Sequence, residues 1–397
     1  MPWKECVPMD EKLLFIADYL RASTSLTKLC QRYGISRKTG YKWIDRYRLQ
    51  GIDGLQEQSR RPKHNCFALS YAQRQAIVKL RTSQPGPLGP KKLQALLKQQ
   101  WGEEQTPSKT TIYNVLKAEG LIKGQRRRRR VHPTEQPLRN SSQPNGLWSV
   151  DYKGQFKTAD GCWCYPLTIM DHASRYLLAI DVYNSTNFKE ARKSFERVFR
   201  EYGLPDRIRS DNGAPFASTG VAGLSRLAVW WIRLGIQPER IERGKPQQNG
   251  RHERMHRTLK QALGKEPAAN AQELQIQIDA FRQHYNTQRP HESLGQQPPE
   301  QNYYPSSKAL PSILPAPNYP PHWDTTIVSS NGLTYWRGLR IYIGYLLVGQ
   351  VIGMQEVAAG QWEVYLNQTR IGCFNEDDKG GAQNDYITLK VLPMSVN

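Results

Sequence analysis

A strand is predicted at Leu147-Trp148-Ser149-Val150-Asp151-Tyr152, where apolar and β-branched residues surround a single acid. Two further runs of this kind, residues 164–170 and 176–182, follow between turn-prone residues, so three antiparallel strands are expected. Residues 188–202 place their apolar side chains on one side of a helix, and a short strand is predicted over 207–210. This order of elements indicates an α/β domain.

Acidic side chains stand at two of these strands. Asp151 lies on the first strand and Asp211 directly follows the fourth, so the two carboxylates are expected to be neighbours across the sheet. Two carboxylates that point at one spot repel each other unless a cation lies between them. The pair therefore suggests a metal site.

A third acid lies on a helix farther along the chain. Residues 244–250 have the composition of a loop, and a helix is predicted from about Arg251, with Glu253 on its first turn. Glu253, Arg257 and Lys260 share one side of that helix, which places a carboxylate beside a basic stripe suited to phosphate. Three carboxylates offer the oxygen ligands of two Mg²⁺ ions and leave positions open for water and substrate.

Other candidate ligands in this region have simpler explanations. Asp171 lies in a turn-prone segment, where its carboxylate is expected to cap a hairpin turn. His252 and His256 have a spacing that zinc could use, but no third ligand is clustered with them. The six cysteines are scattered without a CxxC pair, so free thiols and no structural zinc are expected.

Five short motifs follow one another between residues 145 and 297. They are Val150-Asp151-Tyr152-Lys153-Gly154, Ser210-Asp211-Asn212-Gly213, Asn249-Gly250-Arg251-His252-Glu253-Arg254, Tyr285-Asn286 and Arg289-Pro290-His291. Together they resemble the DDE transposases of bacterial insertion sequences and phages, which share the catalytic core of retroviral integrases. The gap between Asp211 and Glu253 is longer than in many relatives, and an insertion near residues 217–226 would account for the difference.

The resemblance implies a ribonuclease-H-like fold in which Asp151, Asp211 and Glu253 are both the metal ligands and the catalytic residues. It implies Mg²⁺ as cofactor, with Mn²⁺ as a substitute, and a two-metal exchange of phosphodiester bonds without a covalent enzyme intermediate. The zinc-binding amino-terminal domain of integrases is absent from this sequence.

The excess of basic residues lies in the first part of the chain. The 397 residues have a net charge of +21, of which residues 1–150 hold +17 and residues 151–397 hold +4. A concentrated excess of this size indicates a polyanionic partner, and double-stranded DNA fits the motifs described above.

Helical periodicity predicts a helix-turn-helix in residues 1–60. Apolar residues recur at helical spacing from residue 10 to residue 30, Gly34 ends the second helix, and Ser36 caps a third. Its expected DNA-contacting side chains are Arg37, Lys38, Thr39 and Lys42.

A second helix-turn-helix or winged helix is predicted over residues 67–125. Its helices are expected at 70–81 and 90–100, and a third is capped by Ser108 and ends before Gly120. Its expected DNA-contacting side chains are Lys109, Thr110, Thr111 and Asn114. The basic residues that follow, Arg126, Arg127, Arg128, Arg129 and Arg130, suit a minor groove or phosphates, and a flexible tail is the open alternative.

The C-terminal quarter changes character again. Prolines crowd residues 298–321, which predicts an extended linker. Beyond it, hairpins are predicted between 325–328 and 333–336, and between 362–366 and 369–374, so a small β-barrel is expected. The acidic run at 376–378 favours protein contacts over phosphate binding.

The expected fold is multidomain: all-α helix-turn-helix units, an α/β ribonuclease-H-like core and a small β-barrel. The expected boundaries are 1–60 and 67–125 for the DNA-binding units, 126–144 for a basic linker, 145–297 for the catalytic core, 298–322 for the Pro-rich linker and 323–397 for the barrel.

The leading functional hypothesis is a DNA transposase that binds the terminal repeats of a mobile element and integrates the DNA by Mg-dependent strand transfer. The alternatives are a catalytically silent DNA-binding repressor or targeting factor, and a ribonuclease-H-like nuclease. Expected partners are the element ends, target DNA, further copies of the chain in a dimer or tetramer, and a helper ATPase or targeting protein. A cytoplasmic, DNA-associated bacterial protein without membrane contact is expected, because no signal peptide or apolar span is present.

Overall fold

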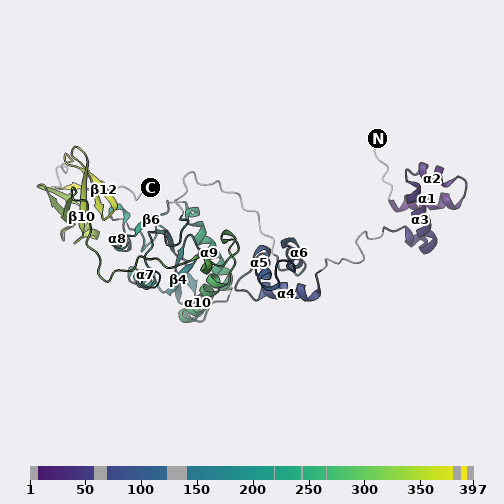
Figure 1. The fold of residues 1–397 in the computed structure, drawn as a ribbon, viewed down its shortest axis with the longest axis horizontal. Helices are drawn as coiled ribbons and strands as arrows, with labels where there is room; N and C mark the ends of the chain where they lie inside the picture. The colour runs from purple at the N-terminus through teal and green to yellow at the C-terminus, as the bar shows by residue number, and fades with distance from the viewer. Residues whose placement is uncertain are drawn as a thin grey trace. The chain divides into compact units, whose positions relative to one another are not determined.

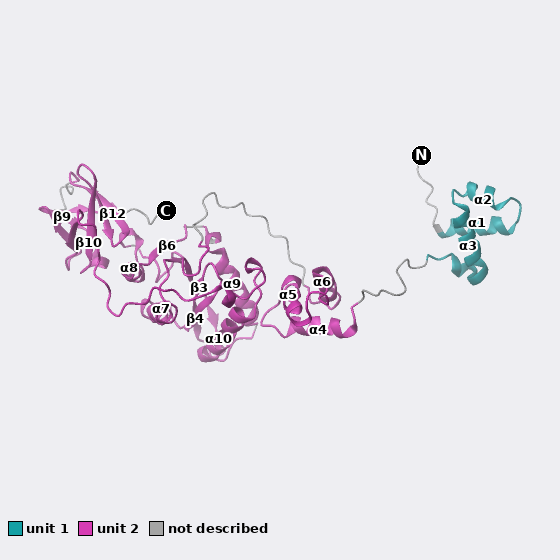
Figure 2. Cartoon of the chain, viewed as in Figure 1, with its two compact units in different colours: residues 1–68 teal, residues 69–397 magenta. Residues whose placement is uncertain are grey.

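The computed structural model describes residues 8–57, 69–122, 141–378 without 219, 243, 244 and 265, and 386–390. The chain divides into two compact units, Met1–Ala68 and Leu69–Asn397 (Figure 2). Among the described residues, no helix is long and apolar enough to cross a lipid bilayer.

The first unit is a small helical bundle with its own core. Its elements are α1 (Pro8–Leu20), α2 (Leu26–Arg32), α3 (Arg37–Gln50) and the 3-10 turn η1 (Gly51–Leu55). Ser36 caps α3 by accepting a hydrogen bond from the amide of Thr39 at 3.2 Å, and Gly34 has a φ of +63° in the preceding turn. Phe15 and Trp43 are buried in the core. The predicted three helices are confirmed.

The second helix-turn-helix begins the second unit. Its helices are α4 (Tyr71–Thr82), α5 (Pro90–Trp101) and α6 (Lys109–Ala118). Ser70 and Gln73 form a capping box at the start of α4, and Ser108 caps α6 by accepting from the Thr111 amide at 3.2 Å. Leu93 is fully buried among the three helices. Each predicted helix is present.

A six-stranded mixed sheet forms the centre of the second unit (Figure 1). Its strands are β1 (Trp148–Tyr152), β2 (Phe156–Lys157), β3 (Trp163–Asp171), β4 (Leu177–Tyr183), β5 (Arg207–Ser210) and β6 (Gln237–Arg240). β3 pairs antiparallel with β1, β2 and β4, while β5 lies parallel between β1 and β6. The four predicted strands are confirmed, and β2 and β6 are additional.

Helices cover both faces of this sheet. They are α7 (Phe188–Tyr202), α8 (Arg226–Arg233), α9 (Gly250–Ala262), which follows the 3-10 turn η3 (Pro246–Asn249), and α10 (Ala271–Thr287). Neighbouring strand residues enter opposite cores: Ile169 packs with α7 and α8, and Met170 packs with α9 and α10. The sheet is thus the middle layer of three.

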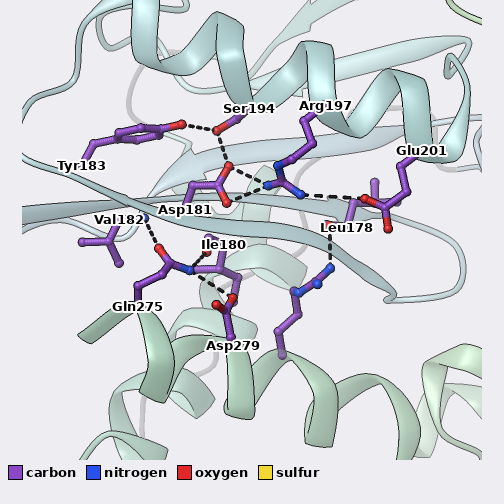
Figure 3. Close-up of polar contacts among 11 residues, drawn as sticks. Leu178, Ile180, Asp181, Val182, Tyr183, Ser194, Arg197, Glu201, Gln275 and Asp279 are labelled. Carbon is purple, nitrogen blue, oxygen red and sulfur yellow. Dashed lines mark hydrogen bonds and ion pairs between the residues drawn. The ribbon is translucent and has the colours of Figure 1, made fainter. Parts of the chain in front are cut away.

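The edge strand β4 is covered by polar side chains of α10 (Figure 3). Gln275 donates from Nε2 to the carbonyl of Ile180 at 2.9 Å and accepts at Oε1 from the amide of Val182 at 2.7 Å. Arg282 donates to the carbonyl of Leu178 at 2.9 Å. These bonds satisfy backbone groups that an edge strand otherwise presents to another chain.

The C-terminal part contains two small sheets. One has the strand order β12-β11-β10-β7 and the other β13-β9-β8. The strands are β7 (Asp324–Ile327), β8 (Leu333–Trp336), β9 (Leu339–Tyr342), β10 (Val351–Ala358), β11 (Gln361–Leu366), β12 (Thr369–Asn375) and β13 (Ile387–Thr388). Three further 3-10 turns are η4 (Glu292–Leu294), η5 (Pro299–Asn302) and η6 (Tyr345–Leu347).

The expected small β-barrel is not confirmed, because the described strands do not close. β7 is an edge strand of one sheet and β8 is an edge strand of the other. A closed barrel would need backbone pairing between these two strands, which instead contact each other through the hydroxyls of Thr326 and Thr334 at 2.6 Å. The predicted hairpin between these strands is wrong for the same reason: β7 pairs with β10 and β8 with β9. The second predicted hairpin is confirmed by the pairing of β11 with β12.

Helix α8 is buried on two sides. Trp231 packs in the core under the central sheet, whereas Val229 and Ile232 pack with the C-terminal sheets. The 3-10 turn η2 (Val221–Gly223), which lies in the expected insertion, adds Ala222 to the same C-terminal core. Helix α8 therefore connects the core under the central sheet with the core of the C-terminal sheets.

Candidate active site

Asp151 and Asp211 lie at the same end of two neighbouring parallel strands. Ser149 of β1 is opposite Arg209 of β5, and each acid lies two residues beyond its member of this pair. Parallel strands carry such positions to one edge of the sheet. The structure therefore brings these two carboxylates together.

The surroundings of Asp151 disfavour its negative charge. Burial, followed by the charge of Asp211 and a smaller effect of Glu253, raises the pKa of Asp151 to about 7. Burial also raises the pKa of Asp211, although this carboxylate accepts a hydrogen bond from the amide of Gly213 at 3.1 Å. A cation placed between the two carboxylates would remove this penalty.

Glu253 lies outside that pair, exposed on the first turn of α9. The helix N-terminus favours a carboxylate at this position. In the described part of the chain, no three His, Cys, Asp or Glu side chains are close enough together to hold a metal ion. Glu253 is nevertheless near enough for its charge to act on Asp151.

A buried hydrogen-bond network ties α9 to the sheet beside Asp151. The hydroxyl of Thr168 donates to the carbonyl of Asp151 at 2.7 Å, and it lies 2.6 Å from Nε2 of His252 and 2.8 Å from Nε2 of His256. Nδ1 of His252 lies 2.8 Å from the hydroxyl of Ser149. The network joins β1, β3 and the helix that carries Glu253.

Both histidines of this network are uncharged. Burial lowers the pKa of His252 to about 3 and also lowers the pKa of His256, so both rings are neutral. Nδ1 of the uncharged His256 lies 3.7 Å from Oδ2 of Asp151. His256 does not neutralise the carboxylate.

Three cations stand near the acids. Arg257 and Lys260 are exposed on α9, as the sequence pattern predicts. Lys153 was not among the predicted site residues, and burial followed by the charge of Lys260 lowers its pKa. The signal for Lys153 is present in the sequence, because it lies two residues after Asp151, on the same side of an extended strand.

Asp171 has the structural role predicted for it. Its Oδ2 accepts from the amide of Ser174 at 2.7 Å and from the Ser174 hydroxyl at 2.6 Å, while Oδ1 accepts from the amide of Asn145 at 2.8 Å. These bonds occupy the carboxylate at the turn between β3 and β4. The four cysteines among the described residues are free thiols, as expected.

The predicted DNA-contacting residues lie on the last helix of each helix-turn-helix. On α3, Arg37, Lys38 and Lys42 are exposed and Thr39 is half-buried. On α6, Lys109, Thr110 and Asn114 are exposed and Thr111 is half-buried. The five arginines 126–130 lie outside the described residues.

Models of known families match the chain in four places. Two models described as integrase core domain match residues 141–246 and 234–299. A helix-turn-helix domain model matches residues 11–63, and a homeodomain-like model matches residues 39–116.

Curated relatives include products of insertion elements and retroviruses. The insertion element IS407 uncharacterized 31.7 kDa protein of Burkholderia multivorans is 27% identical over 46% of this chain and 64% of its own length. The insertion element IS476 uncharacterized 39.2 kDa protein of Xanthomonas euvesicatoria is 29% identical over 46% of this chain and 52% of its own. The Gag-Pol polyprotein of baboon endogenous virus is 33% identical over 31% of this chain and 7% of its own. In each case the chain spans less than two thirds of the relative.

Comparison with solved structures finds the simian T-cell lymphotropic virus intasome in complex with the PP2A regulatory subunit B56 gamma. It covers 76% of this chain and 95% of its own at 18% identity, with a TM-score of 0.36. The HTLV-2 integrase catalytic core domain in complex with magnesium covers 41% of this chain and 98% of its own at 16% identity, with a TM-score of 0.33.

The sequence matches define the class. Residues 141–299 form an integrase core domain of the polynucleotidyl transferase superfamily, and helix-turn-helix domains precede it. The sequence matches support the resemblance of this part of the chain to the DDE transposases with a retroviral-integrase-like core.

Proposed function

We propose that this protein is a transposase that binds the terminal repeats of a mobile element and joins them to target DNA by strand transfer. The observation that carries the proposal is the pair of half-buried carboxylates, Asp151 and Asp211, side by side within an integrase core domain. Their mutual repulsion favours a site that works with bound cations.

Asp151, Asp211 and Glu253 are the proposed catalytic residues and ligands of Mg²⁺, with Mn²⁺ as a substitute. The donor set fits, because carboxylate oxygens are the ligands these hard cations prefer and the raised pKa of Asp151 marks an unneutralised charge. Bound at these residues, the ions would supply activation of the attacking oxygen and stabilisation of the leaving one. Glu253, on the first turn of α9, is the proposed third member of the set.

The remaining residues position DNA and hold the acids. Lys153, Arg257 and Lys260 contact backbone phosphates near the reacting strand, and the Thr168 network holds Asp151 and α9 in register. The attacking group in phosphodiester exchange at such a site is water or a DNA 3′-hydroxyl, so no protein side chain becomes covalently attached to DNA.

The helix-turn-helix units supply sequence recognition in this proposal. Residues 1–60 use Arg37, Lys38, Thr39 and Lys42, and residues 67–125 use Lys109, Thr110, Thr111 and Asn114. Arg126 to Arg130, in the linker 126–144, follow phosphates or a minor groove. Two such units in one chain read a longer site than either alone.

The other parts of the chain serve assembly. The core at 145–297 and the sheets within 323–397, joined by the linker 298–322, work in a dimer or tetramer because two DNA ends must be joined together. A helper ATPase or targeting protein is a further proposed partner, and the proposed location is the bacterial cytoplasm on DNA.

Strand-transfer assays with the purified full chain, terminal-repeat DNA and Mg²⁺ test the proposal. Asp151→Asn, Asp211→Asn and Glu253→Gln are each expected to abolish joining while DNA affinity stays nearly intact. Asp206→Asn is the matched control, because Asp206 immediately precedes β5, at the opposite end from Asp211, and is exposed.

Joining by any of the three acid variants would refute the site. Cleavage without joining by the wild-type chain would instead indicate a nuclease. DNA binding without either reaction would indicate a repressor or targeting factor.

A further inference from the structure

A second group of cations lies beside the acids, where four segments of the second unit meet. Arg175 comes from the turn between β3 and β4, Arg251 and Arg254 from the first turn of α9, Arg289 from the segment after α10, and Lys92 from α5. Each of these side chains acts electrostatically on at least one other in the group. We name them the cation cluster.

The nearby acids are already occupied. Asp171 is held by Ser174 and by the amide of Asn145, and Glu292 forms an ion pair with Lys91. Arg251 donates to Nδ1 of His172 at 2.8 Å, which supplies a hydrogen bond and no negative charge. Among the described residues, Asp171 and Glu292 are therefore not left to neutralise the cation cluster.

Arg289 is the most deeply buried member. Its side chain belongs to a residue only 6% exposed, and its Nη1 has no hydrogen-bond partner. Nε2 of the neighbouring His291 is likewise buried and unpartnered. Buried guanidinium groups are ordinarily paired with an anion, because an isolated charge is costly to remove from water.

Lys92 brings the second helix-turn-helix into the cluster. The Lys91–Glu292 ion pair and a 2.8 Å hydrogen bond between Gln84 and His284 seat this helix-turn-helix on the core. Burial, followed by the charge of Arg289, lowers the pKa of Lys92 to about 8. Lys92 on the helix-turn-helix and Arg289 on the core therefore repel each other. An anion bound between them would attract both side chains.

We infer that this junction binds a phosphate of the DNA backbone, held between Lys92 on the helix-turn-helix side and Arg254 and Arg289 on the core side. The inference rests on the proposed function for its choice of DNA as the source of the phosphate. Guanidinium groups match phosphate oxygens in charge and geometry. Arg254 is next to Glu253 in the chain, so a strand held here runs from a DNA-binding helical unit toward the proposed catalytic acids.

Salt-dependent binding of the full chain to a labelled random-sequence duplex tests this site. Lys92→Gln and Arg254→Gln are each expected to lower the slope of log affinity against log salt by about 1, since one phosphate contact is lost. The double variant is expected to lower it by no more than either single variant, because both residues hold the same phosphate. Lys98→Gln is the control: it removes the same charge from α5, where Lys98 pairs with Glu103, and the slope should not change.

A second arm separates DNA from free phosphate. Melting temperatures are compared in inorganic phosphate and in chloride at equal ionic strength. A larger rise for wild type than for the double variant, together with the slope changes, supports a site that also accepts free phosphate. Slope changes without that rise support DNA phosphate alone.

The other outcomes overturn the inference. Slopes of Lys92→Gln and Arg254→Gln equal to that of Lys98→Gln exclude a DNA phosphate here, even if inorganic phosphate raises the melting temperature. Arg254 is exposed, so its variant keeps the fold and decides the matter if Lys92→Gln does not fold. Failure of the wild-type chain to bind any duplex, by contrast, contradicts the proposed function itself.

Discussion

Thr168 shows how one hydroxyl can organise the surroundings of a candidate active site. It contacts the backbone of Asp151 and both histidines of α9, so it holds the helix against the sheet. The sequence predicts Asp151 and Asp211 because strand ends and turn residues mark them. It does not mark Thr168, because a threonine within an apolar strand has the same pattern whether or not its hydroxyl is used.

Thr168→Val is expected to destabilise the protein by about 1 to 3 kcal/mol, since the shape is kept while three buried polar groups lose their partner. Thr168→Ser, which retains the hydroxyl, should recover most of that loss. Urea unfolding of the three proteins measures the difference. Equal stability of the valine variant and wild type would show that the network contributes nothing.

His172 makes stability dependent on pH. It is buried and accepts from Arg251, and burial followed by that charge lowers its pKa to about 2 from 6.5. Below pH 6.5, His172 therefore binds a proton in the unfolded chain and stays unprotonated in the folded chain. The free energy of unfolding consequently falls as the pH falls.

Replacing His172 by Gln should remove this contribution. Between about pH 6.5 and pH 5, wild type is expected to lose about 2 kcal/mol more than His172→Gln. Urea unfolding at the two pH values measures this, and equal losses would contradict the assignment.

At the scale of elements, α10 acts as a substitute for a missing strand. Its Gln275 bonds both an amide and a carbonyl on the open side of β4 (Figure 3). Gln275→Ala is expected to cost about 1 to 2 kcal/mol, because two backbone groups lose their partners. Gln277→Ala, on the same helix but bonded only to Glu273, is the matched control in thermal unfolding. Equal effects of the two would show that α10 does not stabilise the edge.

Most elements with strong local signals could be predicted. Residues 188–202 and 207–210 match α7 and β5 at both ends, because periodicity, caps and turn residues agree there. Helix α8 escaped prediction because it is short, and its run of apolar residues between Arg226 and Arg233 could equally form a buried strand. The failed hairpin at 325–336 shows that turn residues specify a reversal of the chain and not the partner of each strand.

At the scale of the whole molecule, the C-terminal sheets complete the core that begins on α8. A chain ending at residue 322 leaves Ala228, Val229 and Ile232 without the side chains that cover them. We expect this shortened chain to bind a hydrophobic dye and to aggregate on mild heating. A chain beginning at residue 69, which lacks the other compact unit, should show neither effect. Normal melting of the chain that ends at 322 would contradict the shared core.

Because α8 contributes to two cores at once and the turn at Val221–Gly223 packs in the C-terminal one, the C-terminal sheets are not an exchangeable module. If the C-terminal sheets were exchanged between relatives at the Pro-rich segment, the α8 of one protein would have to pack against the sheets of another. A workable chimera has to carry residues 217–233 along with the sheets, and the crossover then falls only a few positions after Asp211.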